Sequence, residues 1–163
     1  RLLNRAEFHV RTLAEATQLA TLIAQTCPNP DKVVMGLSEL LINGIEHGNL
    51  GISYAEKSRL KREERWLEEI QQRLELPEHQ HKAVRLEFQR FAQEIVIRVV
   101  DQGAGFNWED YLEMDPGRAC DPNGRGIALA RMLSFSSIQY EGRGNIAVAR
   151  ICCQPADTSE ILP

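Results

Sequence analysis

Residues 35–49 (MGLSELLINGIEHGN) constrain the fold most, because they predict a helix with two different faces. Glu39, Asn43 and His47 follow one another at intervals of four residues and would project from one side of that helix. The other side would carry an apolar set that buries against a sheet, namely Val34, Leu37, Leu41 and Ile45. Polar rows of this kind occur on solvated helix faces as well as in sites, so these residues alone leave both interpretations open.

The ends of this helix are also marked in the sequence. Asn29 is a candidate N-cap, Pro30 suits the first helical position and Asp31 adds an acid to the first turn. Gly48 offers a left-handed residue at which the helix would end. We therefore expect a helix over residues 30–47.

Length and charge limit the class of protein. A chain of 163 residues predicts a single domain over 1–163 with a core of its own. A net charge of −4 argues against a dedicated nucleic-acid binder, which needs a clustered basic surface. No apolar run approaches the roughly 20 residues that span a bilayer, and no signal peptide is present, so we expect no membrane partner and a cytoplasmic location. The chain begins with Arg1 rather than Met, which is consistent with a fragment of a longer multidomain regulator.

The remaining patterns predict an α+β fold. Residues 6–11 alternate as an edge strand, and a capping box from Thr12 to Glu15 opens the first helix. Residues 84–88 and 95–100 predict a hairpin that turns near residues 92–93, with 95–100 in the middle of the sheet. Residues 135–141 and 146–153 predict a second hairpin, residues 107–123 a long loop, and residues 126–133 a short helix. The expected architecture is a two-layer α/β sandwich, in which helices cover one face of a mixed, mainly antiparallel sheet.

Residues 51–82 form a charged segment with a helical pattern. Leu60, Leu67 and Leu74 are seven residues apart with Ile70 between them, which predicts a helix with a narrow apolar seam. The seam needs a partner but does not identify it. It would either fold back on its own domain or form a docking or homodimer surface through residues 56–76.

Two glycine clusters complete the set of motifs. Asp101 ends the predicted buried strand, where its carboxylate could accept a hydrogen bond from the exocyclic amine of a base. Gly103 and Gly105 would let the backbone pass close to a flat ligand. Residues 124–126 (Gly-Arg-Gly) would expose free backbone amides at a helix start, which is an anion site. Each cluster alone is weak, because strands often end in Asp-Gly turns and helices often begin after glycines.

The helix and the glycine clusters are chemically compatible. Mg²⁺ prefers oxygen ligands and keeps several waters, so the Asn43 carbonyl together with phosphate oxygens would suit it. Glu39, one turn away, could activate water or a hydroxyl for in-line attack on a γ-phosphate.

The three motifs, in this order, resemble those of a known superfamily. Residues 39–49 (ELLINGIEHGN), 101–106 (DQGAGF) and 124–127 (GRGI) look like the N box and two glycine boxes of the Bergerat-fold (GHKL) ATPases, which include gyrase, histidine kinases and the mismatch-repair ATPase. Within that superfamily the chain most resembles the anti-sigma-factor serine kinases of bacterial partner switching. The likeness covers most of residues 8–153 and excludes 51–82, which is an insertion relative to the compact anti-sigma kinases.

The resemblance implies a sandwich with ATP and Mg²⁺ bound between the helical layer and a lid at residues 107–123. By position, Glu39 resembles the general base, Asn43 the Mg²⁺ ligand and Asp101 the acid that reads adenine. The other implied nucleotide-binding residues are His47, Gly103, Gly105, Phe106, Gly124, Gly126 and Ile127, with Arg118 and Arg125 as candidates to face the phosphates. The family usually has a Gly-Thr pair in its last hairpin, where this chain has Gly144 and Asn145.

Three functions are compatible with these motifs. The first is a serine/threonine kinase that phosphorylates an antagonist protein and also engages a sigma factor, or a phosphatase or receiver module. The second is a non-catalytic module in which the nucleotide only sets the partner surface. The third is the catalytic domain of a histidine kinase.

Overall fold

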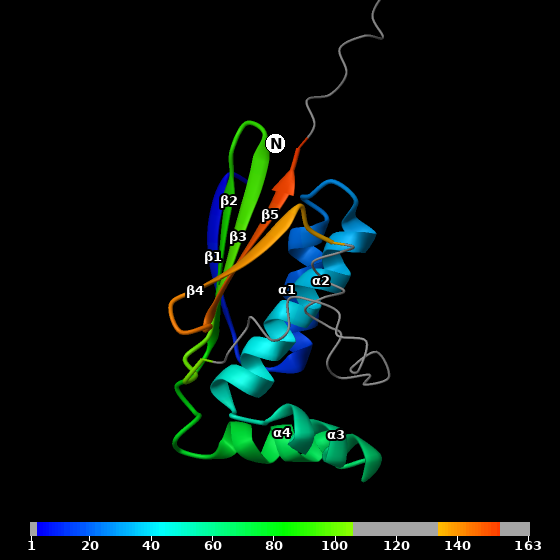
Figure 1. Ribbon diagram of the computed structural model, residues 1–163, viewed down its shortest axis with the longest axis vertical. Helices are drawn as coiled ribbons and strands as arrows, with labels where there is room; N and C mark the ends of the chain where they lie inside the picture. The colour runs from blue at the N-terminus through cyan, green and yellow to red at the C-terminus, as the bar shows by residue number, and fades with distance from the viewer. Residues whose placement is uncertain (1–2, 106–133, 154–163) are drawn as a thin grey trace, which may run out of the picture.

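The computed structural model describes residues 3–105 and 134–153, which form a sheet with helices on one of its faces (Figure 1). Within these residues five strands lie in the order β1-β2-β3-β5-β4, and each pairs antiparallel with its neighbours. Their bounds are β1 Arg5–Val10, β2 Val84–Arg90, β3 Glu94–Val100, β4 Ser137–Glu141 and β5 Ile146–Cys152. The expected α+β class is confirmed. The mixed pairing is not, because every pairing among the described strands is antiparallel.

The helices are α1 (Leu13–Ala24), α2 (Pro30–Asn43), the π-helix η1 (Gly44–Asn49), α3 (Tyr54–Arg62) and α4 (Trp66–Glu75). Figure 1 shows α1 and α2 side by side along one face of the sheet, with α3 and α4 at one end. Among the described residues, no helix is long and apolar enough to cross a membrane.

Alternating buried side chains of the central strands form the core between the sheet and the helices. In β2 and β3 every second side chain is buried, and those side chains face α1 and α2. They are Val84, Leu86, Phe88, Ile95, Ile97 and Val99. β3 lies at the centre of the sheet and β1 at its edge, as the residue patterns predict.

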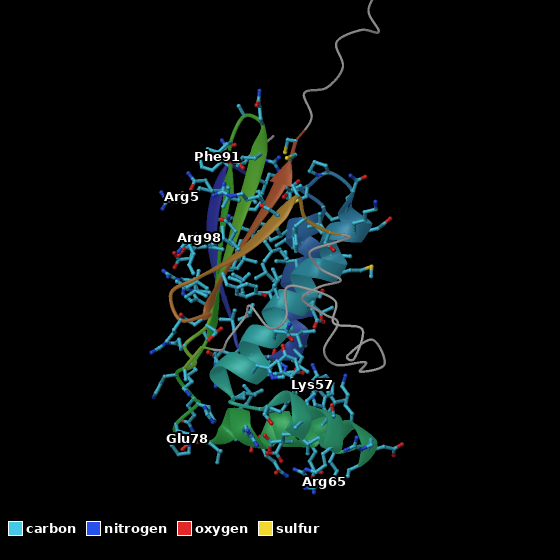
Figure 2. The ribbon with its side chains drawn as sticks, viewed as in Figure 1. Arg5, Lys57, Arg65, Glu78, Phe91 and Arg98 are labelled. Carbon is cyan, nitrogen blue, oxygen red and sulfur yellow. The ribbon has the colours of Figure 1, made fainter. Side chains whose placement is uncertain are left out.

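The other face of the sheet is charged. Arg98 contacts Glu87 at 3.4 Å and Glu141 at 2.9 Å, and Arg150 contacts Glu94 at 3.2 Å. Figure 2 shows Arg98 on the side of the sheet opposite the helices. These half-exposed cross-strand pairs keep this face polar, although each adds little to stability.

The first helix starts as predicted, but the second does so only in part. Thr12 and Glu15 form the capping box of α1. Pro30 and Asp31 occupy the first turn of α2, but Asn29 has a left-handed backbone (φ 52°) and its side chain caps nothing. The buried stripe of α2 and η1 is Val33, Leu37, Leu40, Leu41 and Ile45. Val34, expected in that stripe, is only half-buried because the helix is rotated toward Val33.

The predicted helix does not end at Gly48. After Asn43 its turns widen into η1, and the chain leaves through hydrogen bonds from Leu50 N to Ile45 O (2.9 Å) and from Ile52 N to Glu46 O (2.9 Å). The left-handed glycine is Gly51 (φ 65°) instead. Single π-turns of this kind are rare and are found mostly at functional sites.

Segment 51–82 is helical as predicted, but it forms two helices rather than one. The chain turns at Glu64, whose φ is 56°, and this turn breaks the seven-residue seam. Leu60 and Ile70 are buried, whereas Leu67 is 64% exposed. The segment folds back on its own domain, while a homodimer through residues 56–76 stays a prediction.

The two-helix arrangement predicts that replacing Leu60 and replacing Leu67 lower the free energy of unfolding by different amounts. Leu60→Ala would lower the free energy of unfolding by about 2–5 kcal/mol, because it leaves a cavity in the core. Leu67→Ala would change it by less than about 0.5 kcal/mol, because Leu67 already contacts solvent. Urea unfolding of both variants measures this difference. Equal losses of stability would contradict the exposed position of Leu67 and favour a single helix with a continuous apolar seam.

Candidate functional site

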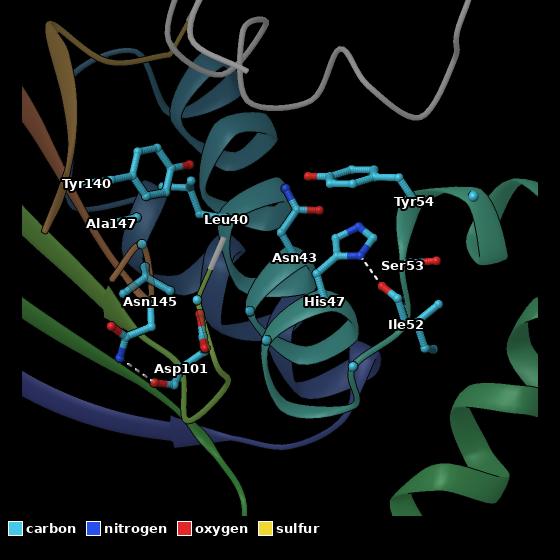
Figure 3. A pocket seen from close by; sticks show the side chains of 17 residues that line it. Leu40, Asn43, His47, Ile52, Ser53, Tyr54, Asp101, Tyr140, Asn145 and Ala147 are labelled. Carbon is cyan, nitrogen blue, oxygen red and sulfur yellow. Dashed lines mark hydrogen bonds between the residues drawn. The ribbon is translucent and has the colours of Figure 1, made fainter. Parts of the chain in front are cut away.

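A cavity of about 510 Å³ lies where α2 and η1 meet the end of β3, the β4–β5 turn and the start of α3. Figure 3 shows Asn43 and His47 on the helix, with Asp101 and Tyr140 to one side and Tyr54 to the other. Its lining residues are Leu40, Asn43, Gly44, His47, Gly48, Gly51, Ile52, Ser53, Tyr54, Ala55, Val99, Asp101, Gly105, Tyr140, Gly144, Asn145 and Ala147. The cavity has the size of a small-molecule site.

Asp101 follows β3 and lies against the helix end. Its Oδ1 accepts a hydrogen bond from Gly103 N at 2.8 Å. Burial raises the pKa of Asp101 from its ordinary value of 3.8 to about 6, although the Gly103 amide and Arg143 oppose that rise. The carboxyl group therefore carries a charge at neutral pH and can accept a hydrogen bond from a ligand.

Gly48 is required where the helix passes Asp101. A Cβ on Gly48 would overlap the Asp101 carboxyl group, and a Cβ on Gly103 would overlap the Gly48 backbone. The two glycines thus let the helix and the strand end touch directly. Gly103 supports Asp101 in this way and does not itself line the cavity.

Glu39 and Asn43 are neighbours on α2, as their four-residue spacing predicts. Asn43 Nδ2 donates to Glu39 Oε1 at 3.2 Å. Asn43 Oδ1 is buried and has no hydrogen-bond partner among the described residues. Asn43 lines the cavity, and Glu39 stands one helical turn away from it.

His47 lines the cavity, and two residues that follow η1 hold its side chain in place. Its Nδ1 donates to the carbonyl of Ile52, and its ring stacks on Tyr54 with 4.0 Å between the ring centroids. Burial lowers the pKa of His47 from 6.5 to about 4. The imidazole is therefore neutral at physiological pH, with its proton on Nδ1.

A buried ion pair joins the site helix to the inserted segment. Glu46 is fully buried, and its Oε2 lies 2.5 Å from Lys57 Nζ on α3. Burial raises the pKa of Glu46, and Lys57 opposes that rise. Arg73 on α4 donates to the carbonyl of Leu50 at 3.0 Å, which adds a second tie to the end of η1.

The β4–β5 hairpin forms the other wall. Asn145 exchanges two hydrogen bonds with Asp101: Asp101 N donates to Asn145 O at 3.0 Å, and Asn145 Nδ2 donates to Asp101 O at 3.2 Å. Asn145 stands where the resembled family has a threonine, and here it fixes the backbone at the strand end. Tyr140 lines the same wall. Its pKa is raised mainly by burial and further by the electrostatic effect of Glu39 and Asp101.

The structure brings four of the predicted site residues to one cavity: Asn43, His47, Asp101 and Gly105. Six others, and the lid at 107–123, lie outside the described residues: Phe106, Arg118, Gly124, Arg125, Gly126 and Ile127. Sequence reasoning missed Tyr54 and Tyr140. The alternation of β4 could have found Tyr140, which follows buried Ile138 by two residues.

The residues on the cavity fit a magnesium ion. The orphaned, buried Asn43 Oδ1 is a hard oxygen donor, and Mg²⁺ is commonly held by one or two protein oxygens together with waters and substrate phosphates. Within residues 3–105 and 134–153, no group of three or more His, Cys, Asp or Glu side chains could form an all-protein metal cage. Asn43 would hold the ion through Oδ1.

The chain also matches the model of a known family. The model of the histidine kinase-like ATPase domain matches residues 4–151. The chain therefore belongs to the histidine kinase-like ATPase domain family, an ATP-binding branch of the Bergerat-fold (GHKL) superfamily. A search of individual curated proteins gave no significant match. The superfamily expected from the three motifs is confirmed.

The raised pKa of Asp101 predicts that this residue lowers the stability of the protein by an amount that depends on pH. Between pH 4 and 6 the folded protein holds a proton on Asp101 that the unfolded chain has released, so this group makes the protein less stable as pH rises through that window. Asp101→Asn removes the effect. We expect its free energy of unfolding, relative to wild type, to increase from pH 4 to 6 and to stay level above pH 7.

Urea unfolding at half-unit pH intervals measures this difference. The slope should not exceed about 1.4 kcal/mol per pH unit, the limit for one proton. A difference between the two proteins that does not vary with pH would contradict the raised pKa.

The Glu46–Lys57 pair predicts a large loss when one partner is removed. Lys57→Met leaves a buried carboxylate without compensation and should cost about 3–5 kcal/mol in thermal or urea unfolding. The double variant Lys57→Met with Glu46→Gln should recover most of that loss. Arg59→Met, which breaks the exposed pair with Glu63, is the matched control and should cost less than about 1 kcal/mol.

Proposed function

We propose that the protein is a Mg²⁺- and ATP-dependent serine/threonine protein kinase of the anti-sigma-factor type, which phosphorylates an antagonist partner in bacterial signalling. One observation carries the proposal. One cavity is lined by both Asp101 and Asn43; Asn43 donates to Glu39 through Nδ2, and its Oδ1 has no hydrogen-bond partner among the described residues. The motif resemblance supports the serine-kinase branch.

The base of ATP would bind at the Asp101 end. The Asp101 carboxylate accepts a hydrogen bond from the exocyclic amine of adenine, which guanine does not present in the same position. Val99 and Ala147 give this end of the cavity apolar walls against which a flat base can pack. The buried, charged acceptor favours adenine, because a base without a donor at this position would add no hydrogen bond to the one that Asp101 accepts from Gly103 N.

The phosphates would extend toward Asn43. Asn43 Oδ1 would hold Mg²⁺, and the bound ion would neutralise charge on the β- and γ-phosphates. The Asn43–Glu39 hydrogen bond engages Nδ2 and leaves Oδ1 as the oxygen that would bind the ion.

Glu39 would act as the general base. It takes the proton of a serine or threonine hydroxyl as that oxygen bonds to the γ-phosphorus. The bond between the γ-phosphorus and the β–γ bridging oxygen breaks, and ADP leaves with its electron pair. Phosphoserine or phosphothreonine and ADP are the products.

The partners would be proteins. The resemblance favours an antagonist as the phosphoacceptor and a sigma factor, or a phosphatase or receiver module, as a further partner. The insertion at 51–82 is the part of the chain that would distinguish this partner from those of compact anti-sigma kinases, and its exposed residue Leu67 is available for contact. A homodimer through residues 56–76 would use the same surface.

One observation favours a second function, a non-catalytic binding module. Glu39 already accepts a hydrogen bond from Asn43 and is absent from the cavity lining. A carboxylate held in this way can orient the Mg²⁺ ligand without abstracting a proton. Nucleotide would then only set the shape of the partner surface.

Glu39→Gln separates the two functions. For a kinase, transfer of γ-³²P from ATP to a protein in host extracts should fall by about 10²- to 10⁴-fold, because a general base is lost. The affinity for Mg·ATP, measured by calorimetry, should change by less than about threefold, because glutamine keeps an oxygen that can accept from Asn43.

Asp31→Asn, an exposed acid at the start of the same helix, is the control and should leave both readouts unchanged. Wild-type protein that binds ATP but labels no protein would favour the binding module. Equal labelling by Glu39→Gln would remove Glu39 from the chemistry. A wild-type chain that binds no Mg·ATP would overturn the proposal itself.

A further inference from the structure

The inserted segment forms part of the cavity wall. Five consecutive residues, 51–55, line the cavity; 51–53 precede α3, and 54 and 55 are its first two residues. The motifs of the ATPase family do not include these residues, since the motifs end at residue 49 and resume at 101. The wall opposite Tyr140 is thus contributed by a part of the chain to which the motifs assign no role.

Tyr54 is the aromatic residue of this wall. It is the first residue of α3, and Ser53 caps that helix by accepting from Glu56 N at 3.1 Å. Its ring stacks on His47 at 4.0 Å with an interplanar angle of 30°. Figure 3 shows its hydroxyl group pointing toward the Asn43 amide, on the side of the cavity away from Asp101.

The position of Tyr54 is fixed by contacts behind it. Lys57, one turn along α3, pairs with buried Glu46 at 2.5 Å. Arg73 on α4 binds both Glu56 at 2.5 Å and the carbonyl of Leu50 at 3.0 Å. Because these ties hold the start of α3 against the end of η1, the ring is preorganised and little entropy is lost when a ligand meets it.

We propose that Tyr54 is a nucleotide-contacting residue, whose hydroxyl hydrogen-bonds the phosphate end of the nucleotide beside Asn43 while its ring keeps His47 in place. This inference rests on the proposed function, in which Asn43 marks the phosphate end and Asp101 the base end. Phosphate oxygens are charged acceptors, and a phenol aimed at them from a preformed wall is a suitable donor. The insertion thus belongs to the nucleotide site as well as to the surface.

Two substitutions separate the hydroxyl from the ring. Tyr54→Phe keeps the stacking on His47 and removes only the hydroxyl, so affinity for Mg·ATP and Mg·ADP should fall about 10- to 100-fold, while affinity for adenosine should not change. Tyr54→Leu removes both groups and should weaken all three ligands. Calorimetry and competition with a fluorescent ATP analogue measure these affinities on the full chain.

A second readout follows His47 without any nucleotide. Burial lowers the pKa of His47 to about 4, and the Tyr54 ring stacks on the imidazole. An NMR titration should find that value unchanged in Tyr54→Phe and raised toward 6.5 in Tyr54→Leu. Gln80→Ala, an exposed change near the end of the same insertion, is the control for both readouts, and thermal unfolding checks that each variant is folded.

The outcomes distinguish this inference from the proposal on which it rests. If wild type binds Mg·ATP and Tyr54→Phe binds it within twofold, the hydroxyl contact is wrong and the proposed function stands. Equal losses for adenosine and ATP would place the contact on the nucleoside and overturn the assignment to the phosphates. If wild type binds no Mg·ATP, the proposed function fails first.

Discussion

The direct contact between the end of the site helix and the end of β3 determines the rest of the site. It exists because Gly48 has no side chain where the helix passes Asp101, and because Gly103 has none where the strand end passes Gly48. Any larger residue would separate the two layers at this point. With the layers in contact, Asp101 and Asn43 face one cavity although they lie on different elements and far apart in the sequence.

The insertion at residues 51–82 supplies partners for the buried polar groups at the end of the site helix. η1 contains the buried carboxylate of Glu46, and the carbonyls of Asn49 and Leu50 lie at its end. Lys57 neutralises the carboxylate, Lys82 donates to the Asn49 carbonyl at 3.0 Å, and Arg73 donates to that of Leu50. Each cation comes from residues 51–82. The π-helix and the insertion therefore stabilise each other, since polar groups buried without partners would be costly.

Local patterns in the sequence predicted much of the fold. The strands were predictable because alternating Val84, Leu86 and Phe88 must face a core, and the Glu39–Asn43 pair because residues four apart meet on a helix. The π-helix was not, because it depends on a tertiary exit of the chain through Ile52 N and Glu46 O. The prediction of one continuous apolar seam was wrong, because the seven-residue spacing of leucines gives no sign of the chain turn at Glu64. Tyr54 was missed because its neighbour His47 belongs to another element.

The buried Glu46 also bears on how such a domain changes in evolution. A deletion that joined residue 50 directly to residue 83 would remove Lys57, which pairs with Glu46, together with α3 and α4. The carboxyl group of Glu46 would then have to contact water, hold a proton or be replaced by a neutral residue. A change in the inserted segment therefore has a direct consequence for a side chain of the site helix.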